Sequence, residues 1–238
     1  MGKNICIVGA SGGIGRAMVD QLAKREDVTR VYALSRQLTA GHQAGVISLQ
    51  IDLSVERSID AAAQQIEVPL DGVIVTSGLL HHADGLRPEK SLGQIKADNM
   101  LEVLAINTVG PALVARYFSQ HLRAGERTVF AALSARVGSI GDNRLGGWYS
   151  YRASKAALNM VLKTMAIEMR RKHPGVIVAG LHPGTVDTTL SKPFQRNVPE
   201  GKLFASDRAA RQLLNVLDGL RPQDSGQVFD WAGQRIPE

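Results

Sequence analysis

The sequence has a single cysteine, few aromatic side chains and no long apolar run. Cys6 is the only cysteine among 238 residues, which excludes an internal disulfide and a cysteine-based metal site; it lies in the first expected strand and should be inert. No stretch of about 18 apolar residues occurs, so no segment should span a membrane. An apolar run begins already at Asn4, which leaves no space for a secretory signal. We expect a soluble cytoplasmic protein.

The charge balance is basic without indicating a particular partner. Lys and Arg number 28 against 22 Asp and Glu, a net charge of +6. Hydrophobic residues make up 44% and charged residues 21%, which is typical of a globular protein and excludes a disordered chain or a coiled coil. The densest basic run, 170–173, falls where a helix should end and compensates the helix dipole. Because no basic stripe is interleaved with aromatic residues, we expect no nucleic-acid partner.

Apolar runs rich in β-branched residues alternate with segments of helical spacing. Most runs are continuously apolar, as is typical of strands buried on both faces of a parallel sheet. We predict a Rossmann-type, doubly wound α/β sheet of about seven strands in the order 3-2-1-4-5-6-7, forming one domain over residues 1–238. The expected strands are 4–8, 30–34, 46–51, 72–75, 128–133, 176–181 and 227–230, and the expected helices are 14–25, 55–65, 92–121, 149–172 and 207–220. Irregular stretches at 81–91 and 188–206 follow strands, where such sheets meet their ligands.

The first expected strand leads through a glycine-rich turn directly into a helix. The turn reads Gly9-Ala10-Ser11-Gly12-Gly13-Ile14-Gly15. Glycine permits the tight turn, lets backbone N–H groups approach a pyrophosphate, and allows the helix to lie close to the strand. A merely tight strand–helix turn is the alternative. The position between the first strand and the first helix favours a dinucleotide site that includes Ser11 and Ile14.

The end of the second expected strand indicates which dinucleotide is preferred. Sheets of this kind that prefer NAD place Asp or Glu there for the ribose 2′-hydroxyl, whereas this chain has Ser35-Arg36. An arginine can bind a 2′-phosphate through two N–H groups, and a carboxylate would repel it. We hypothesise that Ser35 and Arg36 hold this phosphate, so that NADP is preferred over NAD. A solvated loop arginine is the alternative interpretation.

Tyr151 and Lys155 lie four residues apart in the fourth expected helix and therefore share one helix face. A free tyrosine has a pKa of about 10 and is a poor acid or base at neutral pH. A cation one turn away, together with the positive charge of a nicotinamide, favours the phenolate. Tyr149 lacks this arrangement because position 153 is alanine. The pair predicts Tyr151 as a general acid/base.

The glycine turn and the Tyr151–Lys155 pair together make the chain resemble the short-chain dehydrogenases/reductases over essentially its whole length. The resemblance implies an oxidoreductase that interconverts a carbonyl and an alcohol on a small-molecule substrate. From the single cysteine and the histidine positions we expect no metal site. It implies that Ser134 hydrogen-bonds the substrate oxygen and that Tyr151 moves the proton. Lys155 would bind the nicotinamide ribose and lower the tyrosine pKa, and Asn107 would support a proton relay through water.

The resemblance also implies further cofactor contacts. Asp52-Leu53 matches the pair beside the adenine, and the segment 182–188 matches the Pro-Gly segment after the sixth strand. In that segment the Val186 backbone and the Thr188 hydroxyl would hold the nicotinamide carboxamide. The remaining positions assigned to the cofactor are Pro183, Gly184 and, after the fourth strand, Gly78.

Two positions depart from the family pattern. Val8 stands where the family often has Thr, and Thr76-Ser77-Gly78 stands where Asn-Asn-Ala-Gly is usual. Both weaken the implied contacts on the adenine side and leave the residues for hydride transfer untouched.

A narrower resemblance, to the C-factor-like (C-signal-like) subgroup, rests on residues 133–151, 190–204 and 224–227. The subgroup takes its name from a bacterial intercellular signalling role. A cofactor-binding signalling protein with little or no turnover is therefore the alternative function. Related enzymes are dimers or tetramers built on two long helices, here 92–121 and 149–172, so we expect a homo-oligomer.

Other side chains admit both a functional and a structural interpretation. His81-His82 is an adjacent pair of the kind that rarely chelates one metal ion, and an exposed loop is favoured. His182 either packs or contacts substrate. Three aromatic side chains either line an apolar substrate pocket or belong to ordinary packing; they are Trp148, Phe194 and Phe204.

Overall fold

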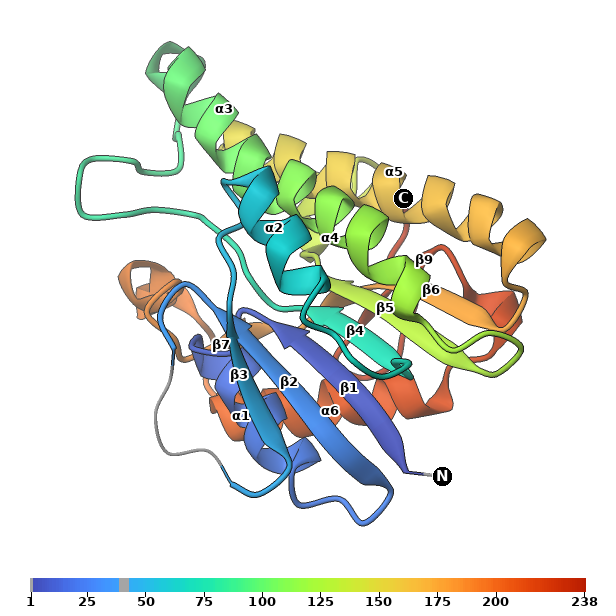
Figure 1. Cartoon of the computed structure of the whole chain (residues 1–238). Helices are drawn as coiled ribbons and strands as arrows, with labels where there is room; N and C mark the ends of the chain where they lie inside the picture. Colours follow the sequence, from blue (N-terminus) through green and yellow to red (C-terminus); the bar gives the residue numbers. More distant parts are fainter. Residues whose placement is uncertain (1, 39–42) are drawn as a thin grey trace.

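The computed structural model describes residues 2–38 and 43–238 and shows a parallel β-sheet between two layers of helices (Figure 1). The main sheet has seven strands in the order β3-β2-β1-β4-β5-β6-β9, and all neighbouring pairs are parallel. This order confirms the prediction, with β9 as the seventh strand. The strands are β1 (Lys3–Val8), β2 (Val28–Ser35), β3 (Val46–Gln50), β4 (Gly72–Val75), β5 (Thr128–Leu133), β6 (Val176–His182) and β9 (Gln227–Asp230).

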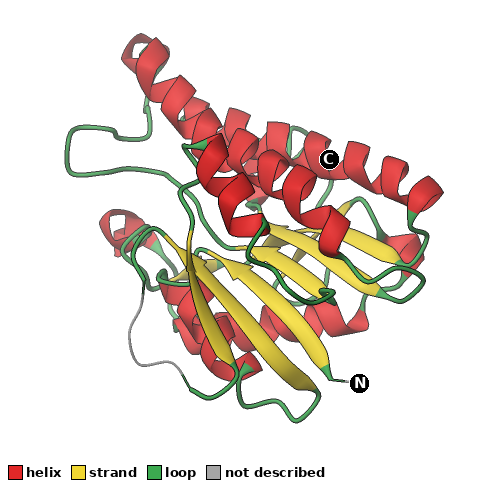
Figure 2. Ribbon diagram, in the orientation of Figure 1, coloured by secondary structure: helices red, strands yellow, loops and turns green. Residues whose placement is uncertain are grey.

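Helices on both faces explain why the strands are continuously apolar (Figure 2). One face is covered by α1 (Gly13–Leu22) and α6 (Ser206–Gly219), and the other by α2 (Glu56–Ala63), α4 (Gly110–Phe118) and α5 (Tyr149–Lys172). Alternate residues of β5 enter different clusters: Phe130 packs with residues of α4 and α5, and Ala131 with residues of α1 and α6. A fully buried side chain such as Phe130 contributes about 1.5–3 kcal/mol to folding. Within the described ranges, none of the helices has the length and apolarity to cross a membrane.

The helix predicted over 92–121 is divided into several pieces. It starts with a 3₁₀ turn at Leu92–Gln94 and continues as α3 (Ala97–Leu104), a π-helical turn (Ala105–Val109) and α4, before ending in a 3₁₀ turn at Ser119–His121. Apolar spacing continues through the π-helical turn and therefore does not reveal it. Such turns are frequent at functional sites, and this one contains the fully buried Asn107.

Two irregular segments lie at the edge of the sheet where the parallel strands end (Figure 1). One follows β4 and covers residues 76–91, and the other covers residues 187–202. The second segment joins β7 (Thr185–Val186) to β8 (Leu203–Phe204), which pair in parallel as a small separate sheet that the sequence did not predict. Both predicted loop regions therefore lie at the edge that also carries the glycine turn.

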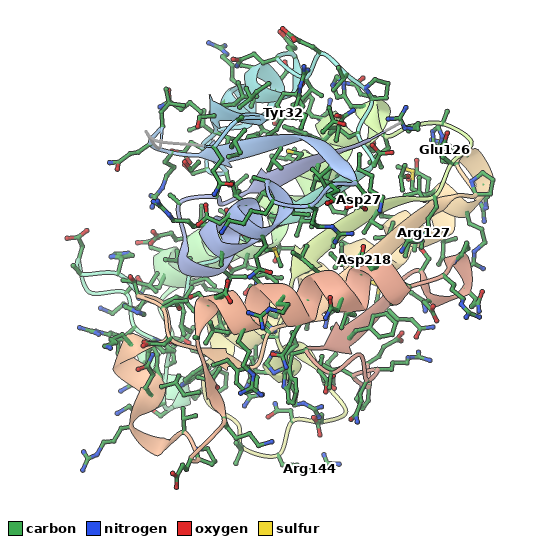
Figure 3. All side chains as sticks on the ribbon, turned by 90° about the horizontal axis from the view of Figure 1, so that it is seen from below. Asp27, Tyr32, Glu126, Arg127, Arg144 and Asp218 are labelled. Atoms are coloured by element: carbon green, nitrogen blue, oxygen red, sulfur yellow. The ribbon has the colours of Figure 1, made fainter. Side chains whose placement is uncertain are left out.

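The opposite edge of the sheet is held by ion pairs and backbone caps. Arg25 binds Asp27 at 2.9 Å and Asp218 at 2.8 Å, which joins the end of α1 to the end of α6. Arg127 donates to the Leu217 carbonyl at 2.6 Å, so a cation caps the carboxyl end of α6. Figure 3 shows Arg127 and Asp218 beside the last turns of this helix.

Candidate active site

The glycine turn is fixed by close backbone packing. Gly9 has a φ of +96°, which glycine adopts readily and other residues rarely. A Cβ added at Gly15 would overlap the Gly9 carbonyl oxygen. A Cβ at Gly13 would lie 2.9 Å from Thr188 Cγ2, so the turn also meets the segment after β7. The glycines at these positions therefore leave a cradle that any side chain would fill.

The amino end of α1 suits an anionic group. Its N-cap residue is Gly12, which has no side chain to satisfy the first N–H groups, and its first turn contains no acidic residue. Ser11, Gly12 and Gly13 are all exposed. Free N–H groups and the positive end of the helix dipole favour a phosphate at this place. These residues fit the pyrophosphate of a dinucleotide.

Thr76 belongs to the segment after β4 that departs from the family pattern, and it binds the glycine turn. Its hydroxyl donates to the Val8 carbonyl at 3.0 Å and to the Gly9 carbonyl at 3.2 Å, which joins the end of β4 to the glycine turn. Two residues further on, a Cβ at Gly78 would lie 3.6 Å from Asn107 Oδ1 and 3.8 Å from Lys155 Nζ. The segment 76–78 thus connects the cofactor side of the site to its catalytic side.

At the end of β2, the side chain of Arg36 is exposed and that of Ser35 is buried. Ser35 is 4% exposed, and its hydroxyl donates to the Gln37 carbonyl at 2.5 Å. Arg36 is exposed at the rim of the sheet. The pKa of Asp52 is lowered first by the hydrogen bonds from Ser54 and further by the nearby Arg36 charge. Of the two predicted phosphate ligands, Arg36 is the one whose side chain is exposed to bind an anion.

Leu53, next to Asp52, is 7% exposed and belongs to the core. A Cβ at Gly110 would lie 2.9 Å from Leu53 Cβ, so α4 begins in direct contact with it. The adenine side of the site therefore rests on the packed core.

Tyr151 and Lys155 lie in the first two turns of α5 and face each other as the sequence predicted. Lys155 is 2% exposed; its Nζ donates to the Leu133 carbonyl at 2.7 Å and lies 5.7 Å from the centre of the Tyr151 ring. Burial lowers the pKa of Lys155 to about 8 and raises the pKa of Tyr151 to about 12. Burial is the cause of the raised Tyr151 pKa, in contrast to the expected lowering by the charge of Lys155. Tyr151 therefore holds its proton at neutral pH.

Asn107 is connected to the tyrosine turn through a residue that the sequence analysis missed. Its Nδ2 donates to the Leu79 carbonyl at 2.8 Å and to Ser154 Oγ at 3.0 Å, and its Oδ1 accepts from the Leu79 N–H at 2.7 Å. Ser154 Oγ in turn donates to the Tyr151 carbonyl at 2.8 Å. The spacing of Ser154, three residues after Tyr151, is the signal that could have identified it.

Ser134 directly follows β5 and binds α5 one turn beyond Lys155. It is 3% exposed, and its hydroxyl donates to Asn159 Oδ1 at 2.6 Å. Asn159 is eight residues from Tyr151, which corresponds to about 12 Å along the helix axis. In this structure the predicted substrate ligand anchors the end of β5 to α5. Asn159 was not predicted as its partner.

The segment 183–188 lies against the glycine turn, as its predicted cofactor role requires. Gly184 has a φ of +74°, and a Cβ there would lie 2.9 Å from the Phe204 ring. Val186 is 4% exposed, and its carbonyl accepts the Ser191 hydroxyl at 2.5 Å. Phe204 packs against Trp231 with ring centres 4.9 Å apart and is 2% exposed. Of the two interpretations of Phe204, lining a substrate pocket or ordinary packing, the structure thus supports ordinary packing.

The histidines show no grouping typical of a metal centre. His82 Nε2 lies 3.3 Å from Glu102, and over residues 2–38 and 43–238 no three His, Cys, Asp or Glu side chains are grouped to hold a metal ion. Burial lowers the pKa of His182 to about 4, and its Nδ1 has no hydrogen-bond partner among the described residues. Cys6 is fully buried, which raises the pKa of its thiol and makes it unreactive.

A family model for short-chain dehydrogenases matches residues 3–199, and the chain belongs to this family. The fold and the site thus define an NAD(P)-dependent oxidoreductase. Within the family it is similar to C-signal of Myxococcus xanthus, at 37% identity over 147 residues, which are 62% of this chain and 83% of that protein. The 1-hydroxy-2-glutathionyl-2-methyl-3-butene dehydrogenase of Rhodococcus sp. (strain AD45) is 32% identical over 94% of this chain and 95% of that protein. The chain is C-signal-like.

The fold is shared with solved structures of the family. The NADPH-bound carbonyl reductase from chicken fatty liver superposes with a TM-score of 0.84 at 24% identity, over 100% of this chain and 99% of that one. The agreement covers the complete sheet and both helix layers.

Proposed function

We propose that this protein is an NADP-dependent carbonyl reductase in which Tyr151 transfers the proton. The observation that carries the proposal is the packing of the partly exposed Tyr151 ring against the buried Lys155 at the edge of the sheet, joined through Ser154 to Asn107. The name of the chicken carbonyl reductase and the dehydrogenase activity named for the Rhodococcus relative support this class of reaction. The overall change is a carbonyl compound, NADPH and a proton giving an alcohol and NADP⁺.

The residues of the chain account for the proton half of this reaction. When bound, the nicotinamide supplies the hydride that adds to the carbonyl carbon. Tyr151 donates its phenolic proton to the carbonyl oxygen, and its raised pKa keeps that proton in place at neutral pH. The Lys155 ammonium, 5.7 Å from the ring centre, stabilises the phenolate that remains. The polar chain through Ser154 and Asn107 holds this turn of α5 in position and connects it to Leu79.

Ser134 can orient the substrate oxygen if its bond to Asn159 is reversed. An Asn side chain can present either its carbonyl oxygen or its NH₂ group to a hydroxyl. When Asn159 Nδ2 donates to Ser134 Oγ, the hydroxyl hydrogen of Ser134 becomes available to a substrate oxygen. We propose this arrangement for the substrate complex.

The cofactor would be held along the edge of the sheet that carries the glycine turn. The α1 terminus takes the pyrophosphate, Arg36 takes the 2′-phosphate, and Lys155 takes the nicotinamide ribose. Ser35 joins Arg36 if its hydroxyl is released from the Gln37 carbonyl. The exposed Arg36 supports the preference for NADP over NAD. The proposed cofactor-binding residues are Gly9, Ser11, Gly12, Gly13, Ile14, Gly15, Ser35, Arg36, Asp52, Leu53, Gly78, Tyr151, Lys155, Pro183, Gly184, Val186 and Thr188.

The first test is a titration of the purified protein with NADPH and NADH, followed by cofactor fluorescence. We expect tight binding of NADPH and weaker binding of NADH, and consumption of NADPH with some members of a panel of ketones and aldehydes. Equal binding of the two cofactors would contradict the NADP preference. Binding of NADPH without turnover of any carbonyl compound would contradict the proposed reaction.

A signalling role without turnover is the second candidate, and the similarity to C-signal is the observation that favours it. The presence of Asn107, Tyr151 and Lys155 in hydrogen-bonded or close-packed positions argues for retained chemistry. The single domain, the cytoplasmic location and the homo-oligomer expected from the sequence stay predictions. A failure to bind either cofactor would place the signalling role first.

A further inference from the structure

We infer that Trp148, together with Phe194 and His81, forms an aromatic wall that selects carbonyl compounds carrying an aryl ring on the carbonyl carbon. The inference rests on the proposed function and specifies its substrate class. The three rings come from different segments: His81 from the segment after β4, Trp148 from the residue before α5, and Phe194 from the segment between β7 and β8.

The rings contact one another and the proposed general acid. Trp148 packs edge-to-face against Phe194 with ring centres 5.1 Å apart and against Tyr151 at 6.1 Å. His81 also packs edge-to-face against Phe194, with ring centres 5.6 Å apart, and its Nε2 donates to the Leu190 carbonyl at 3.1 Å. All four rings are partly exposed, unlike the aromatic side chains of the core such as Phe118 and Phe130. They form a partly exposed apolar surface directly beside Tyr151.

The backbone of Trp148 is held in a conformation that a bulky residue avoids. Its φ is +53°, and it is the one non-glycine residue with a positive φ among the described residues. The two residues before it, Gly146 and Gly147, also have positive φ values. A glycine would adopt this conformation with less strain, so tryptophan at this position is not explained by the turn itself. Strained residues of this kind are concentrated at ligand sites. Here the strained backbone conformation determines where the Trp148 ring lies.

Glu89 supplies the contacts that hold this turn. Its carbonyl accepts the Trp148 N–H at 2.5 Å, and its carboxylate accepts the Ser150 N–H at 3.1 Å together with the Ser150 hydroxyl. Glu89 is 3% exposed, so a buried carboxylate from a distant loop caps the amino end of α5. Because Trp148 is itself the N-cap residue and provides no side-chain cap, Glu89 fixes both the ring and the start of the tyrosine helix.

The chemistry of this wall favours an aryl group over a saturated ring. Aromatic pairs gain from edge-to-face and offset geometries beyond the burial of their area, and a saturated ring of the same size gains the burial alone. When the carbonyl oxygen of a substrate accepts the Tyr151 proton, a substituent on the same carbonyl carbon lies close to Trp148. The substrate class is therefore an aryl ketone or aryl aldehyde.

The test compares acetophenone with cyclohexyl methyl ketone, which share one carbon skeleton. The ratio of their kcat/KM values is measured with NADPH for the wild type and for Trp148→Gly, Trp148→Phe and Tyr149→Leu. Trp148→Gly suits the backbone conformation and removes the ring, so we expect the ratio to fall roughly three- to tenfold in favour of the saturated ketone. Trp148→Phe should restore most of the ratio. Tyr149→Leu, which changes a neighbouring exposed ring, should leave it unchanged.

A ratio that is unchanged in Trp148→Gly overturns the inference while the carbonyl reductase function stands. Binding of both ketones to the NADP-bound protein, followed by ligand-observed NMR, gives a readout that needs no turnover. If neither ketone is reduced, the proposed function fails for these substrates. Stronger acetophenone binding that is lost in Trp148→Gly would still support the wall, and equal binding of the two ketones would overturn it.

Discussion

The cofactor side and the catalytic side of this site are built by different means. The glycine turn depends on the absence of side-chain atoms, because a Cβ at Gly15 would overlap the Gly9 carbonyl. The catalytic side depends on buried polar contacts between distant segments, such as Lys155 with the Leu133 carbonyl and Asn107 with Ser154. The first side should therefore be sensitive to an added methyl group and the second to a lost polar group.

The largest effect is expected for Tyr151→Phe. General acid catalysis contributes roughly 10²–10⁴-fold, so carbonyl turnover should fall by about that factor. Affinity for NADPH should stay nearly unchanged, because the glycine turn and Arg36 are untouched. Steady-state kinetics and a fluorescence titration measure the two quantities separately. Turnover close to that of the wild type would remove Tyr151 from the proposed role.

Lys155→Met tests the buried polar contacts through the pH dependence of stability. The pKa of Lys155 is about 8 in the folded protein against 10.5 for the ordinary side chain. Between these values the unfolded chain binds a proton that the folded chain lacks, so the unfolding free energy rises with pH. The wild type minus variant difference should rise by about 3 kcal/mol across this window. Denaturant unfolding at several pH values measures it, and a flat difference would contradict the burial of the amine.

Gly15→Ala tests the packing of the glycine turn. The added methyl group forces the turn or α1 to shift, which costs about 1–3 kcal/mol and displaces the N–H groups proposed to bind phosphate. We expect weaker NADPH binding and a lower thermal midpoint. Gly219→Ala is the matched control, because no atom of the described residues outside this helix turn lies within 4 Å of a Cβ at this end of α6. Equal NADPH affinity in the Gly15 and Gly219 variants would show that the turn does not hold the cofactor.

The smallest effect concerns the choice between the two cofactors. Arg36→Gln removes the exposed cation proposed for the 2′-phosphate, so the NADPH-to-NADH affinity ratio should fall roughly tenfold or more. Arg170→Gln, in the last turn of α5, removes a comparable charge far from the glycine turn and should leave the ratio unchanged. Similar NADPH-to-NADH affinity ratios in both variants would show that Arg36 is a solvated arginine that does not bind the 2′-phosphate.

The sequence predicted the sheet well because each strand is a continuous apolar run that needs burial on both faces. All seven strands and their order are confirmed, and α5 begins and ends at the predicted residues. The helix over 92–121 was predicted as one piece, because its apolar residues keep their spacing through the π-helical turn at Ala105–Val109. Local patterns therefore identified the elements and not the irregular turn that buries Asn107.

The contacts of the catalytic side could not be predicted in the same way. Glu89 reads as an ordinary charged loop residue, and its burial depends on the meeting of its loop with α5. The positive φ of Trp148 contradicts the local preference of tryptophan and is held by the bond to Glu89. The bond between Ser134 and Asn159 likewise depends on the packing of β5 against α5. These features arise from tertiary contacts between segments far apart in the sequence.

Hydride transfer itself can be followed with NADPH that carries deuterium at both hydrogen positions of nicotinamide C4, so that the label is transferred whichever face of the ring is used. The wild-type protein, the labelled cofactor and a panel of aryl and alkyl carbonyl compounds are incubated together, and the alcohols are analysed by mass spectrometry. We expect alcohol with deuterium on the carbinol carbon for the wild type, and the labelled alcohol should be largely lost in Tyr151→Phe. NADPH bound tightly by the wild type, with no deuterium transferred to any compound of the panel, would contradict the proposed reaction.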